Sequence, residues 1–336
     1  MPSIHDVAKH AGVSVSTVSR VMNGYSLVSN KTRNKVLSVI SELGYKPGGK
    51  GPASSKVSNR TILVITGGAW HSLSDGIAGA ARRAGFDAIF LFTNSDNSPS
   101  YMRYIENNFV EGIILLNICL DHKTIDALIK KCPVVQCGES QNIPAASLVE
   151  YNNEQASYDL TMHLISRGRK KLAFVELESA SGYTIKYLRQ RTAGFKRALK
   201  ENGLELNPSL LRSAALKPQS GIEEYLSNEN KVVEHILSLD KSSRPDGIVF
   251  TSDMLAVGGI STAKRLGISV PVDLSIAAFD DTPFCLITDP KITSLSWPAY
   301  EMGRASANLL IQFIEGKAAA PQHVTLGYDI ITREST

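Results

Sequence analysis

The stretch SIHDVAKHAGVSVSTVSRVMNG, residues 3–24, combines two short helical patterns separated by a glycine. Ser3 can cap the first helix, because Asp6 follows three residues later in the capping-box spacing. Gly12 supplies a turn, and Ser14 can cap the second helix. Two short helices joined by such a turn are typical of the helix-turn-helix, whose second helix lies in the major groove of DNA. An ordinary pair of amphipathic helices is the alternative.

A third helix and a linker follow this pair. The apolar spacing predicts a helix over 30–43, with Ser29 as its cap and Gly44 as its stop. We therefore expect an all-α helix-turn-helix domain over residues 1–46. Residues 47–60 are rich in Gly, Pro, Ser and Lys and poor in apolar anchors, which indicates a linker or hinge.

Charge is divided unevenly along the chain. The first 60 residues hold nine Lys and Arg against two Asp and Glu, a net charge of +7, whereas the whole chain carries +4. The remaining residues therefore carry −3. A basic head on a mildly acidic body is expected when only the head meets a polyanion such as DNA. A solvated basic face is the alternative.

Targeting and cysteine patterns indicate a cytoplasmic protein. The N-terminus lacks the layout of a signal peptide, and no apolar run approaches the roughly 18 residues that span a membrane. The four cysteines have no CxxC spacing, so we expect reduced thiols and neither a disulfide frame nor a zinc site. They are Cys119, Cys132, Cys137 and Cys285.

The body, residues 61–336, alternates between strand-like and helix-like segments. Short β-branched runs predict buried strands, and 3.6-residue periodicity predicts helices between them. The expected strands are 61–66, 88–92, 112–116, 133–136, 172–175, 247–250 and 275–279. The expected helices are 72–84, 98–107, 124–131, 154–166, 191–202, 232–237 and 254–266. This order implies parallel sheets covered on both faces.

These units are too many for one open sheet of ordinary size. We therefore expect an α/β body of two doubly wound parallel-sheet lobes, which bind ligands in the cleft beyond the strands' carboxyl ends. The first lobe is expected over about 61–150 and 282–312, and the second over about 151–281 and 313–336.

Enzymatic constellations are missing from the sequence. It contains no GxGxxG, GxxxxGK[ST], GxSxG or HExxH motif, and its seven histidines lack metal-ligand spacing. The paired Asp280 and Asp281 have no nearby histidine or third acid to complete a metal site. We expect a binding module without cofactor or metal, not an enzyme. A transport-type solute-binding protein and a Rossmann-type enzyme are the alternatives from other classes.

Longer motifs occur in a fixed order along the chain. In the head they are DVAKHAGVSVSTVSRVMNG (6–24) and VSNKTRNKVLSVISELGYKP (28–47). In the body they are VEGIILL (110–116), LISRG (164–168), RTAGF (191–195), TSDMLAVGG (251–259), FDDTPF (279–284) and ITREST (331–336). Over essentially its whole length the chain resembles the LacI/GalR (lactose-repressor) family of bacterial transcription regulators. The family's effector-binding body is itself similar to periplasmic sugar-binding proteins.

The resemblance implies roles for residues of the head. Positions matching Val15, Ser16 and Arg20 read base edges, and Ser19 shares their helix face. The guanidinium of an arginine can donate two hydrogen bonds to guanine, and a valine side chain can pack on a thymine methyl group. The residues that suit phosphate contacts are Ser3, Ser14, Thr17 and Asn30.

The linker departs from the family pattern. Ser54 stands where typical members carry a leucine that wedges into the minor groove, and only Val57 is a larger apolar side chain nearby. We therefore do not expect a wedge-induced kink. Either the linker stays disordered, or Lys50 and Lys56 bind phosphate; we favour the second.

The resemblance also implies an effector site. Arg191 matches the effector-binding arginine and Asp280 its acidic partner, a pair suited to neighbouring hydroxyls or an acid group. Trp297 matches a position that stacks on a sugar face. Other positions of the predicted site are Trp70 and His71 in the first strand-to-helix loop, Glu139 in place of an aspartate, and Ser252 in place of an asparagine.

These residues predict a transcription regulator, and we expect it to be a repressor. It is expected to bind a pseudo-palindromic double-stranded DNA operator as a homodimer, since one three-helix head reads only a few base pairs. Pairing of dimers into tetramers is left open. A small polar metabolite, a sugar or sugar acid, is expected to control it by changing the angle between the lobes.

Overall fold

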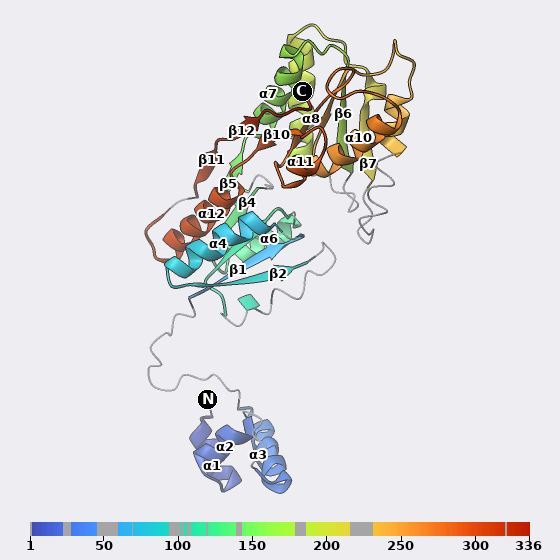
Figure 1. The fold of residues 1–336 in the computed structure, drawn as a ribbon. Helices are drawn as coiled ribbons and strands as arrows, with labels where there is room; N and C mark the ends of the chain where they lie inside the picture. The colour runs from blue at the N-terminus through green and yellow to red at the C-terminus, as the bar shows by residue number, and fades with distance from the viewer. Residues whose placement is uncertain are drawn as a thin grey trace. The chain divides into compact units, whose positions relative to one another are not determined.

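The chain forms two compact units, Met1–Ser58 and Asn59–Thr336, which are considered separately below (Figure 1). A computed structural model describes residues 2–22, 28–45, 60–68, 70–93, 102, 104–105, 109–118, 120–138, 143–178, 186–215, 231–319 and 321–336. The predicted linker, with Lys50, Ser54, Lys56 and Val57, lies almost wholly outside these residues. So does most of the helix predicted over 98–107.

The head contains the three predicted helices, α1 (Ile4–Ala11), α2 (Val15–Met22) and α3 (Asn30–Leu43). Ser3 caps α1 through the predicted capping box: the Asp6 N–H donates to Ser3 Oγ at 3.3 Å, and the Ser3 N–H donates to the Asp6 carboxylate at 2.7 Å. Gly12 ends α1 at φ +63°, where a side chain would be strained. A small apolar core joins the helices, formed by Val7, Ala8, Ala11, Val18, Val21, Val36 and Val39.

The first sheet of the body is parallel throughout. Its strands lie in the order β11, β5, β4, β3, β1, β2. Their bounds are β1 (Thr61–Thr66), β2 (Asp87–Phe92), β3 (Gly112–Leu116), β4 (Val134–Cys137), β5 (Ser147–Tyr151) and β11 (His323–Leu326). In β1, Ile62 and Val64 join the core that holds α4 (His71–Arg83) and α12 (Ala299–Ile314), whereas Leu63 and Ile65 join the core of α6 (His122–Ile129). Burial on both faces explains why β1 is continuously apolar.

The second sheet is parallel except for one edge strand, β12, which runs antiparallel to β10. Its order is β12, β10, β9, β8, β6, β7. The bounds are β6 (Leu172–Glu178), β7 (Leu211–Ala215), β8 (Gly247–Phe250), β9 (Ser275–Phe279), β10 (Thr293–Ser296) and β12 (Asp329–Ile331). The associated helices are α7 (Asn153–Ser166), α8 (Lys186–Glu201), the 3-10 turn η1 (Pro208–Leu210), residues 231–237, α10 (Asp253–Arg265) and α11 (Phe284–Ile287).

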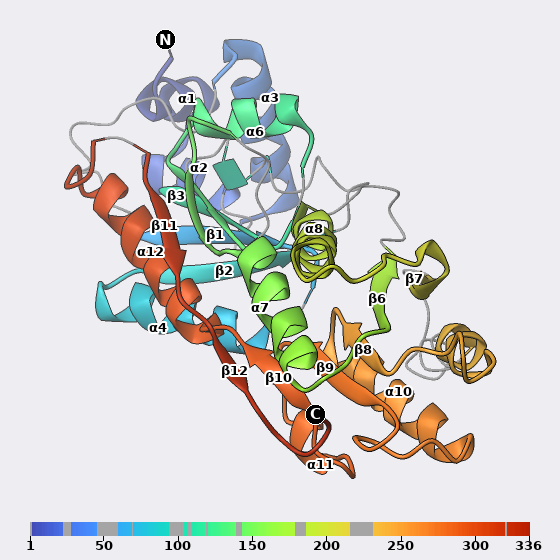
Figure 2. The same cartoon turned by 90° about the horizontal axis from the view of Figure 1, so that it is seen from above.

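Two lobes are built on these sheets, and the chain crosses between them three times. The crossovers join β5 to α7, β10 to α12, and β11 to β12 (Figure 2). The predicted lobe boundaries are therefore wrong in two places. Residues 293–296 belong to the second sheet and residues 323–326 to the first, because strand pairing with distant partners decides sheet membership. The shorter strands β5, β7, β10, β11 and β12 and the helices α11 and α12 were not predicted.

Helices α4 and α12 approach each other closely in the first lobe. A Cβ atom on Gly76 of α4 would lie 2.1 Å from the Tyr300 carbonyl oxygen, and one on Gly303 of α12 would lie 2.1 Å from the Leu73 carbonyl oxygen. Real side chains do not tolerate such distances to backbone atoms. Glycine at these two positions therefore sets the spacing of the helix pair.

We expect Gly76→Ala to lower the free energy of unfolding by about 1–3 kcal/mol, because the helices must separate to admit the methyl group. Gly79→Ala is the matched control in the same helix. There the new Cβ would meet only side-chain tips at 3.4 Å or more, so the better helix propensity of Ala, worth up to about 1 kcal/mol, should dominate. Urea unfolding measures both changes. Equal changes in the two variants would contradict the packing argument.

Candidate functional site

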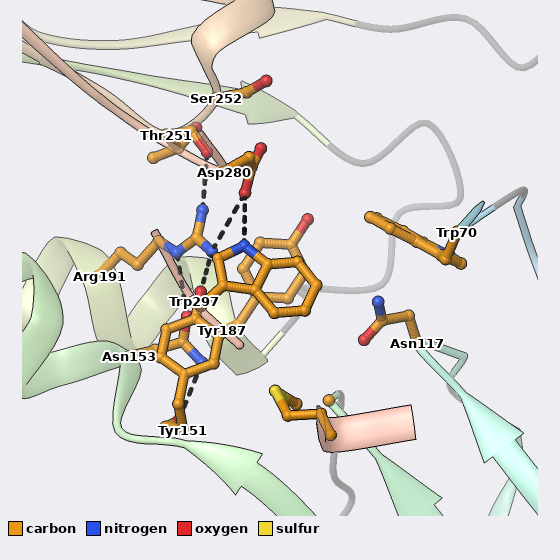
Figure 3. A pocket seen from close by; sticks show the side chains of 12 residues that line it. Trp70, Asn117, Tyr151, Asn153, Tyr187, Arg191, Thr251, Ser252, Asp280 and Trp297 are labelled. Atoms are coloured by element: carbon orange, nitrogen blue, oxygen red, sulfur yellow. Dashed lines mark hydrogen bonds and ion pairs between the residues drawn. The ribbon is translucent and has the colours of Figure 1, made fainter. Parts of the chain in front are cut away.

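One cavity of the body lies at the carboxyl ends of strands from both sheets (Figure 3). Its volume is about 190 Å³, slightly larger than an engineered cavity of about 150 Å³ that binds benzene, so one ring-sized molecule fits. Ligands of open α/β sheets bind at this end of the strands. The lining residues are Trp70, Asn117, Gly138, Tyr151, Asn153, Tyr187, Arg191, Thr251, Ser252, Asp280, Trp297 and Met302.

Arg191 is the buried cation of the cavity, with 5% of its surface exposed. Its guanidinium donates from Nε to Asn153 Oδ1 at 3.0 Å, from Nη1 to the Thr251 carbonyl oxygen at 2.6 Å, and from Nη2 to the Tyr151 hydroxyl at 2.5 Å. It also lies over the Phe279 ring, with 4.0 Å between the Cζ atom and the ring centroid. This fixed geometry holds the guanidinium in one orientation before any ligand arrives.

Asp280 is the acidic partner of Arg191, with 4.0 Å between its Oδ1 and Arg191 Nη2. Burial raises the pKa of Asp280 above its usual range, and the Arg191 charge opposes that rise. The same oxygen accepts a hydrogen bond from Trp297 Nε1 at 3.1 Å. Asp280 has φ +100° and Asp281 φ +51°, a strained backbone that the fold maintains at the rim of the cavity. Arg333 holds the strained turn by donating to Asp281 Oδ1 at 2.6 Å.

Aromatic rings form much of the cavity wall. Trp297 stacks on Tyr151, with 5.7 Å between centroids and 15° between planes. Trp70, which precedes α4, lies across the cavity from Arg191 (Figure 3). Its indole Nε1 is buried and has no hydrogen-bond partner among the described residues. This N–H lies beside Gly68, where a Cβ atom would be 3.4 Å from Nε1, so Trp70 contributes its ring surface to the cavity wall.

The second helix of the head presents a polar surface. Arg20 and Ser16 are exposed, Ser19 and Thr17 are half-buried, and Val15 packs partly against the head core. Ser14 precedes α2, and its Oγ lies 2.8 Å from both the Ser16 and the Thr17 hydroxyls. The exposed residues Ser3 and Asn30 lie at the N-terminal ends of α1 and α3. This places donors suited to DNA phosphates at three helix N-termini.

The structure brings five of the seven predicted effector-site residues to the cavity, namely Trp70, Arg191, Ser252, Asp280 and Trp297. His71 is the first residue of α4, is exposed and is not among the lining residues, so it was wrongly grouped with Trp70. Glu139 lies outside the described residues. Ser252 also caps α10, since its Oγ accepts from the Met254 N–H at 3.3 Å.

Sequence reasoning missed the other lining residues. Most of them share a position, at or just after the carboxyl end of a strand: Asn117 after β3, Gly138 after β4, Tyr151 and Asn153 at β5, and Thr251 after β8. The strand-end rule could have found those beside predicted strands. Tyr187 and Met302 lie in helices and carry no such signal.

Comparison with known proteins identifies the family of the chain. The profile described as "Bacterial regulatory proteins, lacI family" matches residues 3–48, and that of the "Periplasmic binding protein-like domain" matches residues 161–336. Catabolite control protein A of Priestia megaterium is 32% identical over 345 residues, which cover 99% of both chains. The chain belongs to the LacI family. The regulator RegA of Clostridium saccharobutylicum, at 30% identity and 99% coverage of both chains, is a further relative.

Solved LacI-family structures share the fold. The regulator CelR in complex with cellobiose has a TM-score of 0.71 and 22% identity, with 100% of both chains covered. A LacI-family regulator of Enterococcus faecium with bound ribose has a TM-score of 0.69 and 23% identity, covering 82% of this chain and 98% of the other. The chain is thus a LacI-family DNA-binding transcriptional regulator, as predicted. Membership excludes the solute-transport and Rossmann-enzyme alternatives.

Membrane and metal features were searched over the described residues only. None of the described helices is long and apolar enough to cross a membrane. Within the same residues, no group of three or more His, Cys, Asp or Glu side chains could hold a metal ion. Cys137 is a free, buried thiol whose pKa burial raises to about 12, so it is unreactive.

Proposed function

We propose that this LacI-family regulator is a repressor whose cavity binds a neutral sugar or a sugar acid. The observation that carries the proposal is the Arg191–Asp280 pair beside the Trp297 ring in the cavity lining. Sugar hydroxyls can accept from the guanidinium N–H groups and donate to the carboxylate. The apolar faces of a sugar ring suit Trp297. The cellobiose and ribose bound by two structural neighbours support this ligand class.

The DNA-reading surface of the proposed repressor is α2. Arg20, Ser16 and Val15 are assigned to base edges, with Ser19 beside them. Ser3, Ser14, Thr17 and Asn30 are assigned to phosphates, which fix the register of the head. A cytoplasmic location follows from a DNA operator as the partner.

Ligand control of the repressor operates through the two lobes. The cavity takes residues from both sheets, so a ligand there touches both lobes at once. A ligand shifts the equilibrium between lobe arrangements only by its differential affinity for them. A changed lobe angle would change the spacing of two heads and hence their fit to a two-fold operator.

Dimerisation is supported by an apolar surface at α11. Leu286 is 56% exposed and Ile287 is 75% exposed on this short helix, so both apolar side chains are open to a partner surface. We expect Ile287→Asp to weaken self-association by tenfold or more, because it buries a charge in the contact. Sedimentation equilibrium measures the change, with circular dichroism as a check on folding. A variant that associates like the parent protein would place the dimer contact elsewhere.

A thermal-shift screen of cellobiose, D-ribose, D-gluconate and adenine tests the ligand class. A sugar that binds only the folded protein adds about 2.7 kcal/mol of stability at 100 times its Kd. A stabilising sugar or gluconate is the expected result. Stabilisation by adenine alone would overturn the sugar assignment and keep the cavity as the site.

A further inference from the structure

Three aromatic residues mark the three crossovers between the lobes. Tyr151 ends β5, Trp297 follows β10, and Tyr328 lies between β11 and β12. Tyr151 is the central ring: it stacks on Trp297 and meets Tyr328 edge to face, with 6.3 Å between centroids and 64° between planes. Such pairs contribute beyond the area that they bury. The three segments that join the lobes are therefore packed together by their own side chains.

The polar tip of each ring is bound to the second lobe. The Tyr151 hydroxyl accepts from Arg191 of α8, and Trp297 Nε1 donates to Asp280. The Tyr328 hydroxyl donates to Asp159 Oδ2 of α7 at 2.6 Å. Tyr151 ends a strand of the first sheet, so its bond to Arg191 joins the two lobes. Trp297 and Tyr328 adjoin β10 and β12 of the second sheet, so their bonds fix those two crossovers to the second lobe.

Tyr328 differs from the other two rings because it does not line the cavity. It lies behind Tyr151, and its acceptor Asp159 is held in turn by Gln155, whose Nε2 donates to Asp159 Oδ1 at 2.8 Å. Arg197 of α8 donates to Gln155 Oε1 at 2.7 Å. These hydrogen bonds connect the β11–β12 crossover to α7 and α8, and α8 is the helix that carries Arg191.

We infer that Tyr328 is a positioning residue of the effector cavity. Its ring supports Tyr151, which in turn supports Trp297 and accepts from Arg191, so the Tyr328–Asp159 hydrogen bond fixes the cavity wall from outside. The role as an effector cavity rests on the proposed function, whereas the positioning itself does not require any ligand to be known.

The test uses Trp297 as a reporter in the full chain. Trp70→Phe leaves Trp297 as the only tryptophan, since the sequence has two. In that background, we expect Tyr328→Phe to raise the acrylamide quenching constant of Trp297 about twofold through local opening of the cluster. Far-UV circular dichroism should stay unchanged. Tyr158→Phe is the matched control, because it removes a tyrosine hydroxyl of α7 that is hydrogen-bonded to Glu201, away from the crossovers.

Variants at the other end of the hydrogen bond separate positioning from general loosening. Asp159→Asn keeps an acceptor oxygen, so its quenching constant should stay near that of the parent protein. Asp159→Ala removes the acceptor, so its quenching constant should equal that of Tyr328→Phe. The double variant Tyr328→Phe/Asp159→Ala should be no worse than either single change. Unchanged quenching in Tyr328→Phe, or an equal rise in Tyr158→Phe, would overturn the inference. Since no sugar is added, a failed ligand screen leaves this result interpretable.

Discussion

Arg191→Ala should abolish the thermal shift produced by any ligand of the cavity and lower the free energy of unfolding by about 3 kcal/mol. The stability loss has a physical cause, because the change leaves the partly buried Asp280 carboxylate without its cation. It also leaves Asn153 and the Thr251 carbonyl without their donor. Chemical denaturation and the thermal-shift assay measure the two effects separately.

Lys196→Ala is the matched control, since it removes an exposed positive charge from the same helix. Its stability should stay within about 0.5 kcal/mol of the parent protein, with ligand response intact. Arg191→Lys keeps the charge and loses the planar fork, so it should recover part of the stability and little of the binding. A ligand whose shift survives Arg191→Ala unchanged would refute the cavity as its site.

The stability deficit of Arg191→Ala should also depend on pH. In the folded protein the pKa of Asp280 already lies above its ordinary value, and loss of Arg191 raises it further. An acid with a raised folded pKa opposes folding once it ionises, so stability falls as pH rises from the unfolded to the folded pKa. The deficit should therefore be smaller at pH 5 than at pH 8. A deficit that grows on acidification would show that the Asp280 charge is not its cause.

Arg20→Ala should remove discrimination at one guanine in each half-site, at a cost of about 1–3 kcal/mol for that base. Arg20 is exposed on α2, beside Ser16 and Ser19, so it can reach a base edge without rearrangement of the head. Selection of binding sites from a random DNA library measures the preference at each position. The variant should lose the base preference at one position of the half-site and keep the preferences at the others.

Lys9→Ala controls for charge, because it removes one positive charge from α1 of the same head. It should weaken binding similarly on every sequence, or not at all, since an exposed lysine outside the reading helix affects affinity through phosphate electrostatics. Retention of the parental preference by Arg20→Ala would assign base reading to another side chain of α2.

Local signals explain where sequence reasoning succeeded. The head helices begin and end where caps and glycines predict, because Ser3, Ser29 and Gly44 act within one helical turn. The long apolar strands of the body were found for a similar reason. The prediction of lobe membership failed because β10 and β11 pair with strands that are distant in the sequence. Four-residue strands with alternating exposure, such as β11, carry little signal of their own.

The cavity was partly predictable for a different reason. Arg191 and Asp280 stood out because they lie in the quoted motifs, and Trp297 stood out because the sequence has only two tryptophans. Tyr151 and Thr251 did not, because a tyrosine or threonine beside a strand is ordinary and its role depends on what the strand faces. Their contributions, a hydroxyl and a carbonyl oxygen bound to Arg191, become visible only when the two sheets are placed together.

The late position of β11 and β12 in the chain has a consequence for biosynthesis. Each sheet takes one strand from residues 323–331, so neither lobe can complete its fold until that segment leaves the ribosome. The head has its own core and needs only the first 45 residues or so. At about 5–20 residues per second, translation separates the two events by about 15–60 s. During that interval each nascent chain carries a folded helix-turn-helix head, whereas the ligand-binding lobes are still incomplete.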